Sequence, residues 1–460
     1  MAMPMAAPPR IERDGLLDSL LSRYRKQGTP VRVDFRSLVQ WPSYPERATH
    51  LIHPYPAKLL AHIPFFFLAT GGLSKPGDTV LDPFCGSGTV LLESMLAGRN
   101  GLGADANPLA RLITSVKTHR YRVTLLAGEV KQLLRSIPKR ATIAPPDVIN
   151  IDLWFYPHVI EQLLRILQVI QSVEGTARQF FDVCFSNCLK RVSLADPRLS
   201  VPVRLREDQY PKGHWLRVKT SQRIRRLRRV NVIKEFERVV SANLERVARL
   251  SNQHSNGAAV QVVSSDARRL IAERPGLVPN GAEVPGGSVQ LVITSPPYAG
   301  AQKYVRAASL SLGWLGICPS SSLTSHEKQM IGREHFPKHS YAQALHTGID
   351  SADEFLTDVR SRDPLRAHIA ARYLMEMKEV FREIVRVMAS GGFLVLVAGD
   401  NTISKRRFRT SRHLRAMLSE LGLDLRLELV DHIKSRGLMT TRNNTAGLIT
   451  REWVGVFRKL

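Results

Sequence analysis

Apolar residues along this chain fall into short continuous runs and into longer segments with helical spacing. The short runs have the length of buried strands and lie at 79–81, 101–104, 259–263 and 289–293. Apolar residues that recur every three or four positions predict helices at 11–24, 159–167 and 233–247. Strands that alternate with helices are typical of a mainly parallel sheet covered on both faces. The pattern predicts a doubly wound α/β fold.

The strand predicted at 79–81 runs into the glycine turn Asp82-Pro83-Phe84-Cys85-Gly86-Ser87-Gly88-Thr89, and a helical segment follows. Strand, glycine turn and helix form the geometry in which a backbone approaches a cofactor closely. The next strand ends in Asp105, about 20 residues downstream, a spacing that lets a carboxylate accept hydrogen bonds from ribose hydroxyls. The alternative is an ordinary βαβ unit with a tight turn.

The turn favours a nucleoside-type cofactor over a nicotinamide cofactor. The third glycine of a dinucleotide-binding turn is absent, and Asp82 at the strand end would repel a pyrophosphate. A cation beside Asp82, such as a sulfonium or an α-amino group, would instead be stabilised.

A second turn follows the strand predicted at 289–293 and reads Thr294-Ser295-Pro296-Pro297-Tyr298. Two prolines stiffen this turn and remove two N–H donors, so it presents carbonyl acceptors beside the Ser295 hydroxyl. Tyr298 adds a flat face for stacking. Acceptors beside an aromatic ring suit the exocyclic amino group of a nucleobase. The alternative is a proline-rich turn with no chemistry.

The composition of the chain limits the classes of partner that it is expected to bind. The chain has 460 residues, 43% of them hydrophobic, and 66 Lys and Arg against 40 Asp and Glu give a net charge of +26. Such an excess favours a polyanion, with an anionic membrane surface as the competing explanation. No apolar run approaches the roughly 18 residues of a membrane span, and we recognise no signal peptide. We expect a cytoplasmic protein, associated with the nucleoid if it is bacterial.

The four cysteines form no disulfide framework, which indicates a reducing compartment. Cys184 and Cys188 share one predicted helix face without further partners at zinc spacing, so we expect no metal site. Cys85 lies inside the glycine turn, where we expect it to pack and not to act as a nucleophile.

The two turns together resemble those of the S-adenosylmethionine-dependent DNA methyltransferases that methylate amino groups, and most closely the N4-cytosine branch. The segment 53–58, His-Pro-Tyr-Pro-Ala-Lys, resembles the cofactor-cradling segment of that family, and Asp266 resembles the carboxylate that holds the adenine amino group. The resemblance implies catalysis by Ser295, Pro296, Pro297 and Tyr298. It implies that the cofactor S-adenosyl-L-methionine is bound by His53, Tyr55, Lys58, Asp82, Pro83, Phe84, Gly86, Gly88, Thr89, Asp105, Ala106 and Asp266.

The resemblance also implies DNA as the partner, with the target base flipped out of the duplex, and a possible cognate restriction endonuclease or other defence partner. Serine at 295, where adenine enzymes often have aspartate, favours cytosine. The alternatives are methylation of adenine N6 in DNA, methylation of RNA, or a DNA-binding protein that has kept the fold without turnover.

About 155 residues separate Ala110 from Asp266, far more than a βα crossover needs. We therefore expect an N-terminal extension at 1–50, a cofactor-binding half at 51–150, a largely helical basic insertion at 151–257 and a catalytic half at 258–460. Residues 190–249 contain seventeen Lys and Arg but six Asp and Glu.

Two basic clusters are candidate DNA-binding sites. They consist of Arg223, Arg225, Arg226, Arg228 and Arg229 in the insertion, and of Lys405, Arg406, Arg407 and Arg409 after a late strand. A charge run is usually a solvated face, which is the alternative. Gln302, Tyr304 and Arg306 are expected near the pocket rim, and 318–351 is either a cover over the site or a surface loop.

Overall fold

The computed structural model describes residues 10–11, 15–40, 47–56, 58–253, 257–300, 304–433 and 450–460. Its centre is an eight-stranded sheet in the order β2 (Val31–Val33), β11 (Leu423–His432), β12 (Arg451–Lys459), β8 (Met388–Ala398), β7 (Val289–Thr294), β4 (Thr79–Asp82), β5 (Asn100–Ala104) and β6 (Val260–Ser264). Only β12 in this sheet runs antiparallel to its neighbours. The predicted mixed α/β fold with a mainly parallel sheet is confirmed.

Strand order reverses between β4 and β7. From β4 the chain continues outward to β5 and β6, whereas β7 lies on the other side of β4 and pairs next with β8. Ligands of open α/β sheets bind outside the carboxyl ends of the strands at such a switch point. The two turns found in the sequence therefore begin at neighbouring positions on one sheet edge.

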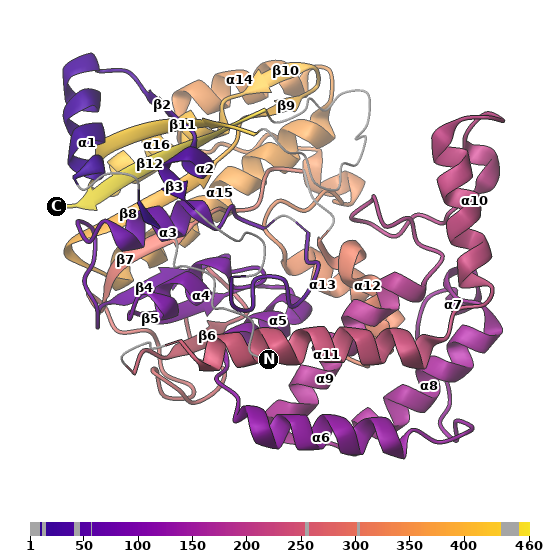
Figure 1. Cartoon of the computed structure of the whole chain (residues 1–460). Helices are drawn as coiled ribbons and strands as arrows, with labels where there is room; N and C mark the ends of the chain where they lie inside the picture. The colour runs from indigo at the N-terminus through magenta and orange to yellow at the C-terminus, as the bar shows by residue number, and fades with distance from the viewer. Residues whose placement is uncertain are drawn as a thin grey trace.

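Helices cover both faces of the sheet (Figure 1) because alternate strand residues point to opposite sides. Val80 and Leu291 pack with α1 (Leu16–Gln27) and α3 (His62–Ala69). Their chain neighbours Leu81 and Val292 pack on the other face. The helices of that face include α14 (Asp350–Arg360), α15 (Pro364–Val387) and α16 (Thr410–Glu420).

A helical layer extends from the β6 end of the sheet (Figure 1). It contains α6 (Val123–Ser136), α8 (Pro157–Gln171), α9 (Gly175–Val192), α10 (Trp215–Leu227) and α11 (Val232–Ser251). Its core, with Phe180, Phe181 and Phe236, is continuous with residues of α5 (Pro108–Thr118) and α12 (Tyr304–Trp314). Helix α6 belongs to this layer although it precedes residue 151. The expected division into domains stays a prediction.

The remaining elements are α4 (Thr89–Leu96) and several short ones. These are β1 (Arg10–Ile11), α2 (Phe35–Leu38), β3 (Val39–Gln40), α7 (Ile151–Trp154), η1 (Glu207–Gln209), η2 (Ser320–Ser322), α13 (Leu323–Gln329), η3 (Lys338–Tyr341), β9 (Asn401–Ile403) and β10 (Arg406–Phe408). Within the described part of the chain, no helix combines the length and the apolar character that a membrane crossing requires.

Candidate active site

The glycine turn after β4 is held by a carboxylate and by close packing. Asp82 Oδ1 accepts hydrogen bonds from Thr294 Oγ1 (2.7 Å) at the end of β7 and from the Phe84 backbone N–H (3.1 Å). Burial raises the pKa of Asp82 to about 7, although both hydrogen bonds favour the ionised form. Asp82 therefore joins the two strands at the switch point. It is not among the residues that line the pocket shared by Asp105 and Ser295, and its direct contact with the cofactor stays a prediction.

Gly88 is required at the start of α4. Its φ is +73°, and a Cβ there would lie 2.8 Å from Thr114 Cγ2 of the neighbouring helix α5. The absence of a side chain lets α4 begin immediately after the turn and leaves the turn pressed against α5. Gly88 thus allows the turn to pack closely on α5, and Thr89, the first residue of α4, is buried.

Asp105 organises the opposite side of the turn. Its carboxylate accepts a hydrogen bond from the Gly86 backbone N–H (2.9 Å) and another from the Asn107 backbone N–H (2.8 Å). Burial is the main cause that raises the pKa of Asp105, against these two bonds. A carboxylate has about four acceptor positions, so Asp105 retains capacity to accept from a ligand.

One pocket brings most of the predicted residues together. Its lining comes from the cofactor turn, the loop at residue 55, the end of β5, the loop after β6, the second turn, the start of α12, and the end of α13 with the residues after it. The lining residues are Tyr55, Pro83, Phe84, Gly86, Asp105, Ala106, Ser265, Asp266, Ala267, Ser295, Pro297, Tyr304, Gln329, Met330 and Ile331. Carboxylates and aromatic faces thus meet Ser295 in a single cavity.

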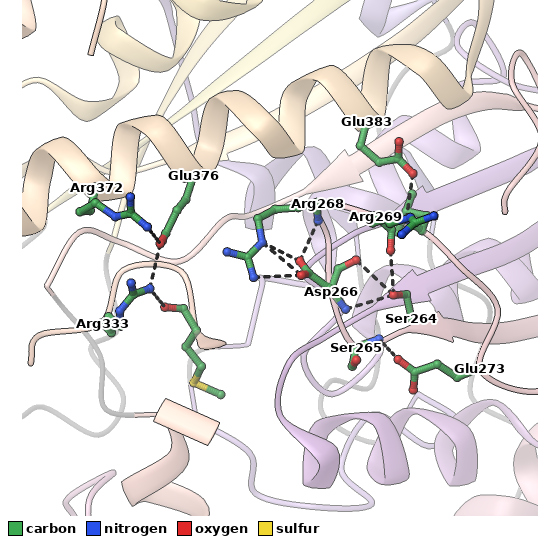
Figure 2. Close-up of polar contacts among 12 residues, drawn as sticks. Ser264, Ser265, Asp266, Arg268, Arg269, Glu273, Arg333, Arg372, Glu376 and Glu383 are labelled. Carbon is green, nitrogen blue, oxygen red and sulfur yellow. Dashed lines mark hydrogen bonds and ion pairs between the residues drawn. The ribbon is translucent and has the colours of Figure 1, made fainter. Parts of the chain in front are cut away.

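The loop after β6 presents Asp266 to this pocket. The Arg268 guanidinium donates two hydrogen bonds to the Asp266 carboxylate (Figure 2), from Nε and from Nη2, each at 2.9 Å. Ser264 Oγ donates to the carbonyls of Asp266 (3.1 Å) and Arg269 (3.0 Å), which closes the loop on itself. Asp266 is held in place, and its side chain remains 43% exposed for one further hydrogen bond.

Comparison with known proteins agrees with this geometry. A family model described as DNA methylase, for N6 and N4 enzymes, matches residues 71–114, the segment from before β4 into α5 that contains the glycine turn and Asp105. The comparisons support an S-adenosylmethionine-dependent DNA methyltransferase family for this chain.

Relatives of this methyltransferase extend the likeness beyond the cofactor turn. Type II methyltransferase M.MvaI of Kocuria varians is 23% identical over 372 residues, which are 77% of this chain and 77% of the relative. Type II methyltransferase M.MjaII of Methanocaldococcus jannaschii is 39% identical over 83 residues, 18% of this chain and 15% of the relative. A candidate DNA modification methylase from Thermus thermophilus, solved with S-adenosyl-L-methionine, is 20% identical with a TM-score of 0.19, over 38% of this chain and 49% of its own.

The loop expected to cradle the cofactor contributes one residue to the pocket of the methyltransferase. Tyr55 lines it, and its hydroxyl accepts a hydrogen bond from Asn107 Nδ2 (3.1 Å). Lys58 Nζ instead donates to the His53 carbonyl (2.6 Å), and burial lowers the pKa of Lys58 to about 8. His53 Nε2 bonds with Ser186 Oγ (2.9 Å), and His53 lines a neighbouring cavity beside α9 and α12. Lys58 and His53 hold the loop; the structure does not place them in the cofactor pocket.

A segment from later in the chain, residues 329–333, packs against the second turn and is called the wall below. Gly332 has φ +80°, and its carbonyl accepts a hydrogen bond from the Gly300 N–H (3.1 Å). Arg333 Nη1 donates to Glu376 Oε1 of α15 at 2.8 Å (Figure 2), which ties this wall to the sheet domain. The wall has no periodic pattern of apolar residues that would have predicted its place, yet Gln329, Met330 and Ile331 line the pocket.

Six further predicted positions complete the description of the site. Tyr304 lines the pocket, as expected for the rim. Arg306 Nε instead lies 3.8 Å from Glu327 Oε1 of α13. Gln302 lies outside the described residues. Pro296 and Tyr298 belong to the second turn without lining the cavity. Cys85 is buried with its Sγ 4.0 Å from Thr114 Oγ1, so it packs as expected.

The two basic clusters differ in how much of their charge is compensated. Lys405 lies at the tip of the β9–β10 hairpin, where Ser404 and Lys405 both have positive φ. Arg406 pairs with Asp358, and Arg407 pairs with Asp400 at 2.9 Å. In the other cluster Arg223 is partly buried and donates to the carbonyls of Lys190 and Arg191. The exposed members of that cluster are Arg225, Arg226, Arg228 and Arg229.

Proposed function

We propose that this methyltransferase transfers a methyl group from S-adenosyl-L-methionine to the exocyclic N4 amino group of cytosine in duplex DNA. One observation carries the proposal: Ser295 and Pro297 of the second turn line the same pocket as Gly86 and Asp105 of the cofactor turn. A cofactor site and an acceptor site that share one cavity allow direct transfer between two ligands without a covalent intermediate on the protein.

The pocket suits an adenosine bearing a cationic sulfur. Asp105 retains acceptor capacity for a ribose diol, Asp266 for the amino group of adenine, and Phe84 and Ile331 offer faces for a planar ring. S-adenosyl-L-methionine supplies a methyl group activated by its positive charge. Asp82 contributes indirectly, since it fixes the turn through Thr294 and Phe84.

The acceptor side has the groups that an aromatic amine needs. Such a nitrogen is a poor nucleophile because its lone pair is conjugated with the ring. If Ser295 Oγ and the Pro296 carbonyl accept hydrogen bonds from its two N–H groups, the nitrogen becomes more tetrahedral. Its lone pair is then directed at the methyl group of the cofactor. The contribution of the protein is then positioning and electrostatics.

The target base has to leave the duplex to reach this turn, and Tyr298 is the proposed stacking partner. The backbone around Tyr298 is fixed from two directions: Asn401 Nδ2 donates to the Ala299 carbonyl (3.1 Å), and Gly332 packs against the Tyr298 carbonyl. The basic clusters are proposed to hold the phosphates. A cognate restriction endonuclease as partner stays a prediction of the resemblance.

Mass spectrometry of nucleosides tests the proposal. DNA from cells expressing the protein should contain N4-methylcytosine, and a Ser295→Ala/Tyr298→Ala variant that still binds cofactor should produce none. N6-methyladenine alone would overturn the cytosine assignment and leave amino methylation standing, whereas 5-methylcytosine would overturn both. Methylation found in RNA but not in DNA would replace the substrate.

A further inference from the structure

Helix α10 presents a second chemistry besides its positive charge. It stands at the edge of the molecule, apart from the sheet (Figure 1). At about 100° per residue, one outward stripe roughly 120° wide carries six exposed side chains. They are Trp215, Val218, Lys219, Gln222, Arg225 and Arg226. We propose that this stripe is a recognition surface that enters the major groove and reads base edges, with Gln222 at its centre.

The inner side of α10 accounts for its attachment. Thr220, Ile224 and Leu227 are buried, and the latter two pack with Leu194 and Leu205 in a small apolar cluster of their own. Arg223 Nη2 adds hydrogen bonds to two carbonyls at the end of α9. Arg226 Nη2 of the outer stripe also donates to the Arg191 carbonyl (3.2 Å), whereas Trp215, Val218 and Gln222 are exposed on the side away from the apolar cluster.

The composition of the stripe matches a duplex groove. Residues 215–229 contain seven Lys and Arg and no Asp or Glu, which complements a polyanion. Gln222 is exposed at the centre of the stripe, and glutamine forms a paired hydrogen bond with the N6 and N7 edge of adenine. Arginine does the same with guanine, and Val218, 47% exposed, offers an apolar contact for a thymine methyl group.

The dimensions agree as well. A helix of 13 residues is about 20 Å long and about 10–12 Å wide with its side chains, and the major groove is about 12 Å wide. Phosphate binding alone does not require apolar side chains, yet Trp215 (58% exposed) and Val218 lie on the same side of the helix as the arginines.

The start of the helix is stiffened by stacked rings. Tyr210 and His214 stack with centroids 5.4 Å apart, and His214 lies 6.0 Å from Trp215. His214 Nδ1 also accepts a hydrogen bond from the Leu216 N–H at 3.2 Å, and so caps the helix. Lys219 Nζ lies 4.8 Å from the centre of the Trp215 ring. The stripe therefore has a defined orientation before it meets a ligand.

This inference rests on the proposed function for its choice of DNA, but it can be tested without methylation. Purified protein with a cofactor analogue would be mixed with a pool of randomised duplexes, and the bound duplexes sequenced. The wild type should enrich one motif. Gln222→Ala should lose discrimination at one base pair by about fivefold to 150-fold, the effect of one paired base contact, while total binding to unrelated DNA should change little.

The matched control is Gln171→Ala, an exposed glutamine at the end of α8 in the same helical layer, which should leave the motif unchanged. An identical motif in Gln222→Ala and in Arg225→Ala would overturn the inference, as would a wild-type protein that enriches no sequence. Because binding is measured, a protein that selects a motif yet yields no methylated cytosine would refute the proposed function and leave this inference standing.

Discussion

Gly332 provides a direct test of whether the wall after α13 positions the catalytic turn. A Cβ at this position would lie 2.7 Å from the Tyr298 carbonyl oxygen, against the 3.4 Å at which ordinary contact begins, so Gly332→Ala must separate the two backbones by about 0.7 Å. Neither partner is a flexible side-chain end. A misplacement of about 1 Å at an active site costs about 100-fold in rate, and we expect kcat to fall by nearly that factor.

Gly316→Ala is the matched control because Gly316 has a φ of +64° but no atom within 4 Å of its added Cβ. Both variants force alanine into the left-handed region, at a cost of about 1–2 kcal/mol in stability, and only Gly332→Ala also displaces the turn. Single-turnover rates on cognate DNA, with thermal melting of each variant, separate the two effects. Equal rates for the two variants would refute the positioning role of the wall.

Three other changes probe separate parts of the site. Asp105→Ala should weaken cofactor binding about tenfold to 100-fold, the effect of one charged hydrogen-bond partner worth about 1.5–3 kcal/mol; unchanged affinity in calorimetry would remove Asp105 from the site. Because the pKa of Asp82 is raised to about 7 when folded, its stabilising contribution is complete below its unfolded pKa and is lost as pH rises through 7. Urea unfolding of Asp82→Asn should then show a smaller loss of stability between about pH 4 and pH 7 than the wild type, and parallel curves would contradict this. The third variant replaces Arg225, Arg226, Arg228 and Arg229 with glutamine. If these arginines contact phosphates, the slope of log affinity against log salt should flatten by up to roughly 3–4 units, about 0.9 per phosphate. An unchanged slope would mean that they face solvent.

Residues that follow directly from a strand were predictable from the sequence. Asp105 and Ser295 each come immediately after a strand, β5 and β7, and the carboxyl ends of parallel strands meet at one edge. Their shared pocket follows from the sheet order, and the switch point between β4 and β7 explains why 212 positions in the sequence separate Asp82 from its partner Thr294.

Residues placed by tertiary contacts were not predictable in the same way. The pocket-lining segment at 329–331 has no periodicity, and its position depends on Gly332 at the second turn and on the Arg333–Glu376 ion pair. Lys58 shows another limit of a linear pattern. Its ammonium group is buried against the carbonyls of His50 and His53, a contact that the motif could not reveal, and its role at the cofactor stays a prediction.

The order of the sheet has a practical consequence for anyone who wishes to control this chemistry. The cofactor turn lies on β4 and the acceptor turn on β7, and between β6 and β7 the chain passes through exposed residues 279–281. A break there would leave each half with one of the two turns and neither half with a whole site. The chain thus offers a natural position for a two-part enzyme whose activity depends on reunion of its fragments, with the Asp82–Thr294 hydrogen bond re-formed across the seam.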